Sequence, residues 1–389
     1  MQKSLGIYLH IPFCPARCNY CDFLTFPHAE AYHAPYLEAL VREMDIPFVR
    51  DTLNERIADS IYVGGGTPSM MSADAIARLF DVLNERTTVS PEAEITLEAN
   101  PGTFTTRDVS IWKKAGVNRV SLGVQTFSDA LLSRIARMHT AEDARKAVQT
   151  LRDGGICNIN IDLILALPEQ TKDDIARDLE EIERIEPTHV SWYELILEEK
   201  TLLGYLVQRG EIALPSEETS VALFVQAAQG LQAMGFSRYE ISNFARAGRE
   251  SRHNLKYWTG KEYLGLGLGA SGYVGGERHE NTRKISYYME RVKRGEDPGE
   301  ILPRTRADDL FEQVMMGFRK IRGIDRARFL EKNGVDVVDL APETVAREVA
   351  RGMMGVTAER VFMTEQGLWV QNDILSDLWL EWDARESFF

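Results

Sequence analysis

Three cysteines, Cys14, Cys18 and Cys21, lie within eight residues near the N-terminus in the pattern C-x3-C-x2-C. So few cysteines make a poor disulfide framework for a chain of this size, whereas clustered thiolates are ligands for zinc and for iron-sulfur clusters. Structural zinc normally takes four protein ligands in two separated pairs, and here only His10 or His28 could complete a set. The pattern favours a metal or cluster site that is one protein ligand short.

Other polar residues follow the carboxyl ends of expected strands. The segment 64–67 (GGGT) follows one apolar run, and Glu98, Gln125 and Asp162 end or follow three more. The loops at the carboxyl edge of a parallel sheet converge on one ligand-binding mouth. We therefore expect these residues and the cysteine cluster to share one site.

The elements that must position these residues alternate along the first half of the chain. Helical patterns separate the strand candidates, and Thr171 with Asp174 forms a capping box at the start of one helix. Six strands with interposed helices predict a parallel α/β sheet, either a partial barrel or an open doubly wound sheet. The six strand candidates are 6–11, 59–66, 94–100, 119–125, 157–165 and 189–196.

The second half changes character. A helix is expected near 219–234, residues 253–276 are rich in glycine and aromatic residues, and 295–305 resembles a linker. A small terminal domain follows, with a helix and then a hairpin at 360–370 that turns at Gly367, which suggests a winged-helix shape. From Arg304 onward, twelve Lys and Arg face sixteen Asp and Glu, so nucleic-acid binding is disfavoured.

Composition sets the class. The 389 residues are 44% hydrophobic with a formal net charge of -14, which indicates a soluble globular protein whose average surface repels nucleic acid and anionic lipid. No apolar run reaches the roughly 18 residues that span a bilayer, and the first residues lack a signal-peptide cleavage site. The expected location is the cytosol.

With an aromatic residue just before its last cysteine, the cysteine pattern resembles the signature of radical S-adenosylmethionine (SAM) proteins. The resemblance implies a partial (β/α)6 barrel and a [4Fe-4S] cluster held by Cys14, Cys18 and Cys21. The amino and carboxylate groups of SAM would then bind the fourth iron, and an electron from the cluster would cleave the sulfonium. This chemistry belongs mainly to the cofactor.

The resemblance extends to a SAM pocket of the coproporphyrinogen oxidase-like branch of this superfamily. Ala136, where that branch usually has glycine, is a departure that affects the backbone beside Arg137. We interpret Cys157 as a buried thiol and His139, His189 and His279 as structural. The residues that match SAM-pocket positions are Tyr8, Tyr20, Gly65, Gly66, Thr67, Glu98, Gln125, Arg137 and Asp162.

Two features separate the members of this branch. The oxygen-independent coproporphyrinogen III oxidases carry another cysteine two positions after the third ligand, where this chain has Phe23, and they have a longer N-terminal segment. Both features favour the haem chaperones of the HemW type. The oxidase, an oxidative decarboxylase, and a radical SAM methylase remain the alternatives, and whether the chain is an enzyme stays open.

The segment "HNLKYW" resembles the haem-associated H-N-x-x-Y-W motif of these chaperones. His253 would be an axial ligand of haem iron, and Tyr257 and Trp258 could stack on the porphyrin. The alternative is a surface loop whose aromatic residues cover the barrel. The following "GLGLGAS" lacks the context of a dinucleotide-binding loop.

The resemblance covers nearly the whole chain. It implies a radical SAM core at 1–240, an extension with the haem motif at 241–300 and a small α+β, winged-helix-like domain at 301–389. The implied partners are haem and haem-acceptor proteins, namely respiratory enzymes and bacterioferritin-like proteins. The resemblance also allows peripheral association with the inner face of the membrane and a homodimer.

Overall fold

The computed structural model describes residues 3–385 and divides the chain into two compact units. The first unit contains residues up to 237, 244–253 and 261–302, and the second contains 238–243, 254–260 and the residues from 303 onward. Within residues 3–385, none of the helices has both the length and the apolar character that crossing a membrane requires.

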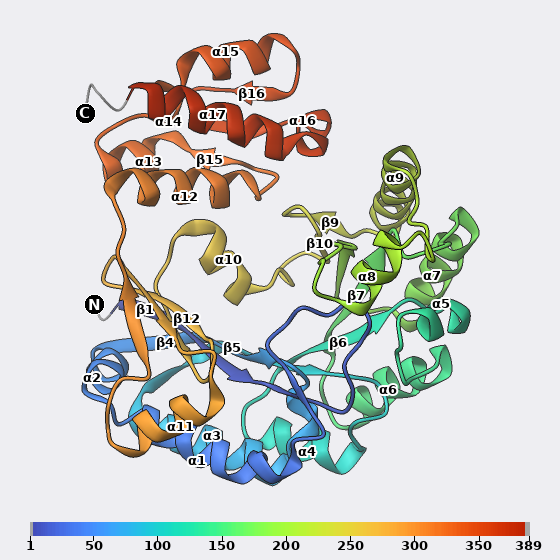
Figure 1. Ribbon diagram of the computed structural model, residues 1–389, viewed down its shortest axis with the longest axis vertical. Coiled ribbons are helices and arrows are strands. Elements are labelled where there is room, and N and C mark those ends of the chain that lie inside the picture. Colours follow the sequence, from blue (N-terminus) through green and yellow to red (C-terminus); the bar gives the residue numbers. More distant parts are fainter. Residues whose placement is uncertain (1–2, 386–389) are drawn as a thin grey trace. The chain divides into compact units, whose positions relative to one another are not determined.

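The first unit is built on six parallel strands that pair in chain order. Figure 1 shows helices along the outer side of the curved sheet. The far neighbour of the first strand is β11 rather than β8, so the six strands do not close on themselves and the predicted partial (β/α)6 barrel is confirmed. The strands are β1 (Lys3–Ile11), β4 (Arg56–Gly65), β5 (Thr88–Ala99), β6 (Arg119–Gln125), β7 (Asn158–Leu165) and β8 (His189–Glu194). The helices are α1 (His33–Glu43), α2 (Pro47–Glu55), α3 (Ala73–Arg86), α4 (Thr106–Lys114), α5 (Asp129–Arg134), α6 (Ala141–Asp153), α7 (Lys172–Ile185), α8 (Leu202–Gln208) and α9 (Glu217–Ala233).

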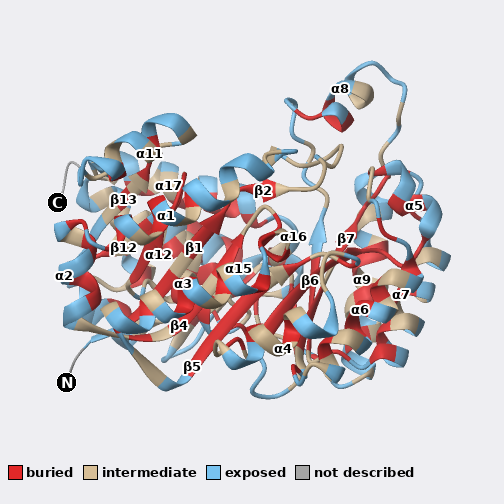
Figure 2. Ribbon diagram, turned by 90° about the horizontal axis from the view of Figure 1, so that it is seen from below, coloured by how far each residue is buried: buried red, intermediate tan, exposed pale blue. Residues whose placement is uncertain are grey.

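Residues alternate along these strands between an apolar face and a polar face. The apolar set, such as Ile61, Leu97 and Leu122, joins one large core with the helices, and Figure 2 shows the strands buried and the outer helix faces exposed. The other face is polar, and its side chains bond to one another from strand to strand. This polar face carries Ser60, Tyr62, Glu94, Thr96, Glu98, Arg119, Ser121, Asn160, Asp162, His189 and Ser191.

Residues 263–302 add four strands beside β1. β11 runs parallel to β1, and the next three are antiparallel. The predicted linker at 295–305 is therefore wrong in part, because β14 pairs with β13; prolines that flank a short edge strand imitate a linker in sequence. The elements are β11 (Tyr263–Leu266), β12 (Ser271–Val274), β13 (Glu277–Asn281), α11 (Ile285–Lys293) and β14 (Gly299–Leu302); the short strands β2 (Phe13–Cys14), β3 (Phe26–Pro27), β9 (Ser237–Arg238) and β10 (Asn243–Ala245) and helix α10 (Arg252–Thr259) complete this part of the chain.

The second unit has its own core and a three-stranded sheet in the order β15-β17-β16. Its helix and strand order is winged-helix-like, but the predicted hairpin at 360–370 is wrong. β17 pairs with the preceding β16, and the Thr364 side chain accepts a hydrogen bond from Gly367 N, so a helix starts where the sequence predicts a turn. The elements are α12 (Arg306–Phe318), β15 (Ile324–Asp325), α13 (Arg326–Asn333), α14 (Val337–Leu340), α15 (Pro342–Ala350), β16 (Met354–Val356), β17 (Arg360–Met363), α16 (Glu365–Trp369) and α17 (Gln371–Arg385).

Candidate cluster and ligand site

Backbone hydrogen bonds join the cysteine loop after β1 to the glycine loop after β4. Gly66 N donates to Ile11 O at 2.8 Å, and Thr67 N donates to Phe13 O at 2.7 Å. A Cβ on Gly66 would lie 2.6 Å from Phe13 O, so only glycine permits this approach. The glycine loop thereby fixes the start of the cysteine loop.

Gly65 is constrained more strongly than the others. Its φ is +117°, and a Cβ there would lie 2.6 Å from the His10 ring. Its backbone N–H donates to Glu98 Oε2 at 3.0 Å, and the Tyr62 hydroxyl donates to Glu98 Oε1 at 2.7 Å. Burial raises the pKa of Glu98 to about 7, although its side chain remains partly exposed.

A chain of side-chain hydrogen bonds joins two of the three thiols. The Thr67 hydroxyl lies 3.5 Å from Cys14 Sγ and 2.8 Å from Asn100 Nδ2. Arg137 Nη2 donates to Asn100 Oδ1 at 2.7 Å, and its Nη1 donates to Cys18 Sγ at 3.5 Å. The sequence predicted Thr67 and Arg137 but missed Asn100, although Asn100 directly follows β5.

The surroundings of Cys14 and Cys21 disfavour the charged forms of their thiols. Burial raises the pKa of Cys14 to about 11, and the neighbouring thiols raise it further while Thr67 and Arg137 lower it. Burial also raises the pKa of Cys21. In residues 3–385 no three His, Cys, Asp or Glu side chains converge on a single metal ion. A cluster places each thiolate on a different iron, so this donor set fits a cluster better than one ion.

Gln125 ends β6, whereas Asp162 lies inside β7, three residues before its last residue, so the expectation that Asp162 follows a strand end is wrong. Gln125 has a left-handed backbone with φ +72°, and its Nε2 lies 3.0 Å from where a Cβ of Gly123 would be. Asn100 Oδ1 and Arg137 Nη2 would lie 2.6 and 3.2 Å from the same Cβ, and Gly123 is not among the predicted site residues. Asp162 accepts hydrogen bonds from Ser121 at 2.9 Å and Asn160 at 2.7 Å, and burial raises its pKa.

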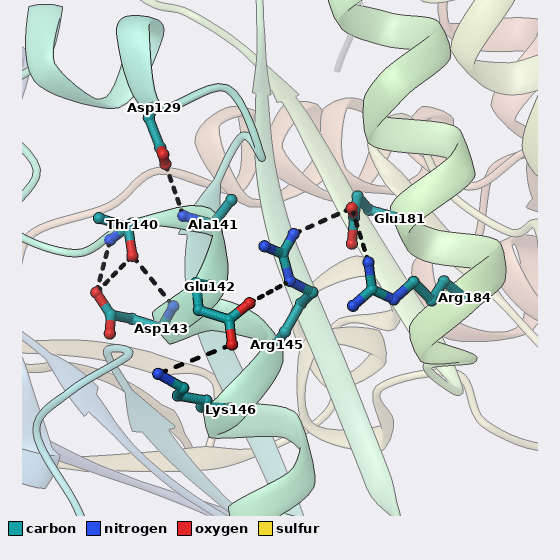
Figure 3. Close-up of polar contacts among 9 residues, drawn as sticks. All are labelled: Asp129, Thr140, Ala141, Glu142, Asp143, Arg145, Lys146, Glu181 and Arg184. Atoms are coloured by element: carbon teal, nitrogen blue, oxygen red, sulfur yellow. Dashed lines mark hydrogen bonds and ion pairs between the residues drawn. The ribbon is translucent and has the colours of Figure 1, made fainter.

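The loop that carries Arg137 is held at both ends. At one end, the Arg137 backbone N–H donates to Leu132 O in α5, and the preceding residue, Ala136, has φ +56°. This left-handed residue explains why glycine is usual there. Figure 3 shows the other end, where Thr140 and Asp143 form the capping box of α6 and Asp129 accepts from Ala141 N at 2.8 Å.

Tyr8 lies on β1 before the cysteine loop, and Tyr20 lies within the loop between Cys18 and Cys21. The Tyr8 hydroxyl bonds to His10 Nδ1 at 2.9 Å, and the two tyrosine rings of Tyr8 and Tyr62 lie 6.3 Å apart. Tyr20 packs on a small apolar cluster that includes Leu131, and the nearby Arg137 opposes the rise in its pKa caused by burial. Both tyrosines thus lie among the predicted SAM-pocket residues.

The structure places His253 away from the cysteine loop. Its side chain is 0% exposed, its Nδ1 lies 3.0 Å from the Ser60 hydroxyl, and its ring packs 5.4 Å from Tyr62. Ser60 precedes Gly64 by four residues, or about 13 Å along a strand. Tyr257 and Trp258 continue the same helix, α10, within the second unit.

The three histidines that were interpreted as structural have structural contacts. His139 bonds to Val124 O at 3.0 Å, His189 Nδ1 lies 2.6 Å from Asn160 Oδ1, and His279 pairs with Asp297. The expectation for Cys157 is wrong, because its side chain is exposed. It precedes β7 and so escapes the burial that the strand pattern suggested.

Comparisons with known proteins show which family the chain resembles. Residues 8–182 match the Radical SAM superfamily and 305–370 match the HemN C-terminal domain. The chain is 35% identical to the haem chaperone HemW of Bacillus subtilis over 94% of this chain and 97% of that protein, and 34% identical to HemW of Escherichia coli over 95% and 97%. The solved structure of coproporphyrinogen III oxidase (HemN) from Escherichia coli aligns with a TM-score of 0.84 at 22% identity, covering 97% of this chain and 90% of that one, which shows the shared fold.

Proposed function

The chain belongs to the HemW family of the radical SAM superfamily, and we propose that it is a haem chaperone that binds haem and delivers it to haem-requiring proteins. The observation that carries the proposal is the 30–35% identity to proteins of that name over most of their length. We propose respiratory enzymes and bacterioferritin-like proteins as acceptors, with the chaperone in the cytosol or at the inner face of the membrane.

Membership of the superfamily implies a [4Fe-4S] cluster and SAM. Cys14, Cys18 and Cys21 would hold the cluster, which supplies an electron to SAM when both are bound. Within the chain, the Arg137 guanidinium and the Thr67 hydroxyl stabilise charge on the sulfurs.

SAM fits the groups beside the thiols. Arg137 Nε is buried without a hydrogen-bond partner, which suits a carboxylate. Glu98, Gln125 and Asp162 offer acceptors for ribose hydroxyls along the polar face, and the glycine loop at 65–67 lets the backbone approach the methionine part. Tyr8 and Tyr20 flank this space.

The cluster proposal is tested by anaerobic reconstitution. Replacing Cys14, Cys18 or Cys21 with Ala should abolish the iron-sulfur absorbance near ~400 nm and lower the iron content. Cys157→Ser is the matched control and should retain both, because that thiol is exposed and outside the loop. A full cluster in all three alanine variants contradicts the assignment.

Haem binding is proposed for the H-N-x-x-Y-W motif of α10, with His253 as iron ligand and Tyr257 and Trp258 as stacking residues. Because His253 is fully buried against Ser60 and Tyr62, coordination requires the first turn of α10 to move. Titrating haem should give a Soret change that is much weaker in His253→Ala. His189→Ala, which removes another fully buried histidine, controls for lost packing. Equal binding by wild type and His253→Ala contradicts the ligand.

Catalytic alternatives are separated by their products. The fold is shared with an oxidase, so the reconstituted chain is incubated anaerobically with reductant, SAM and coproporphyrinogen III. A chaperone should release neither protoporphyrinogen nor S-adenosylhomocysteine. Formation of stoichiometric protoporphyrinogen would establish oxidase activity. Formation of S-adenosylhomocysteine would establish methylase activity.

A further inference from the structure

Asn100 occupies the centre of the hydrogen-bond chain between Cys14 and Cys18. Its amide contacts Thr67 at one end and Arg137 at the other, and these residues follow β4 and α5 respectively. Its backbone is fixed as well, because Asn100 O accepts from the Thr103 hydroxyl at 2.7 Å. Asn100 itself touches neither thiol through any hydrogen bond found in residues 3–385.

The donor and acceptor chemistry sets the direction of every bond. A guanidinium only donates, so the oxygen of the amide must face Arg137 and its NH2 group must face Thr67. The Thr67 oxygen therefore accepts from Asn100, which leaves its hydroxyl hydrogen to be donated to Cys14 Sγ. One amide orients donors on two sulfurs.

The three sulfurs receive different donors. Cys14 faces a neutral hydroxyl, Cys18 faces a charged guanidinium, and Cys21 is bonded by the backbone of Phe23. Hydrogen bonds to ligating sulfurs favour the reduced, more negative state of an iron-sulfur cluster and raise its reduction potential.

We propose that Asn100 is a positioning residue that sets the reduction potential of the cluster, by holding the Thr67 and Arg137 donors on Cys14 and Cys18. The inference rests on the cluster of the proposed function. It concerns the one-electron reduction of the cluster and needs neither SAM nor haem.

The test is a redox titration of the reconstituted full-length chain without SAM, followed by electron paramagnetic resonance. In Asn100→Leu the reduced-to-oxidised ratio at the wild-type midpoint should fall about tenfold, equivalent to about 59 mV for one electron. Ser69→Ala is the control: Ser69 bonds to Asn100 N at 3.3 Å but not to its side chain, so its midpoint should equal that of wild type.

Thr67 provides a second measurement if Asn100→Leu fails to hold a cluster. Thr67→Val removes the hydroxyl and should lower the midpoint, whereas Thr67→Ser keeps the hydroxyl and should restore it. Equal midpoints in wild type and Asn100→Leu, or in Thr67→Val and Thr67→Ser, overturn the role of Asn100 and leave the cluster proposal intact. A wild-type chain that binds no iron and sulfide overturns both.

Discussion

Replacing Gly65 with Ala should destabilise the chain through two separable effects. The first is backbone strain, because φ +117° is a conformation that residues with a side chain rarely adopt, at a cost of about 1–2 kcal/mol. The second is overpacking, because the new Cβ would lie 2.6 Å from the His10 ring. Tyr8 and Leu24 O both bond to that ring, so it cannot move freely, and overpacking adds about 1–3 kcal/mol.

Gly102→Ala isolates the first effect. Gly102 has φ +81° with no atom within 4 Å of its added Cβ, so it should cost only the backbone term of about 1–2 kcal/mol. Free energies of unfolding come from urea denaturation followed by circular dichroism, with m-values compared among variants. When His10 is already Ala, the ring that the new Cβ would meet is gone. In that background Gly65→Ala should cost only the free energy of backbone strain and no longer that of overpacking. Equal costs for Gly65→Ala and Gly102→Ala, or an unchanged cost of Gly65→Ala in the His10→Ala background, would refute the reasoning.

Two further changes test other features of the first unit. Ala136→Gly should stabilise the chain by about 0.5–1 kcal/mol in thermal unfolding, because φ is +56° there, whereas Ala115→Gly at φ -73° should destabilise it. Burial raises the pKa of Glu43 to about 7, although Asn281 and Tyr288 donate hydrogen bonds to its carboxyl group. Ionising Glu43 therefore costs more free energy in the folded chain than in the unfolded chain. The contribution of Glu43 to stability falls as pH rises from about 4.5 to 7. Compared with Glu43→Gln in urea denaturation at each pH, wild type should therefore lose about 3 kcal/mol of relative stability across that range, and parallel curves would contradict the burial argument.

Local chemistry explains which parts of the fold were predictable. The Thr171–Asp174 capping box depends only on neighbours within one turn, and the structure has it. The predicted hairpin at 360–370 is wrong because glycine locally favours a turn over a helix, whereas Gly367 lies in α16. Met353 O lies 1.9 Å from where a Cβ of Gly367 would be, so this close contact requires glycine at position 367. The contact cannot be predicted from the residues around Gly367.

The candidate site also combines residues that local sequence predicts with residues that depend on distant contacts. Cysteine spacing and expected strand ends predicted several residues of the candidate site from local sequence, and their roles toward a cluster and SAM stay predictions. Asn100 was missed since its importance depends on Arg137, a residue 37 positions away along the chain. The buried position of His253 also depends on distant partners, Ser60 and Tyr62, which no pattern around the histidine contains.

The polar face of the sheet supports ligand binding independently of any family resemblance. Parallel strands covered on both faces are normally apolar throughout, yet here one face carries Glu98, Arg119 and Asp162. In residues 3–385, Thr96 Oγ1 and Arg119 Nε are buried without hydrogen-bond partners, and such groups cost free energy. The Arg119 charge also opposes the rise in pKa that burial causes at Glu98 and Asp162. Glu98, Arg119 and Asp162 therefore make this face unlike the interior of an ordinary parallel sheet.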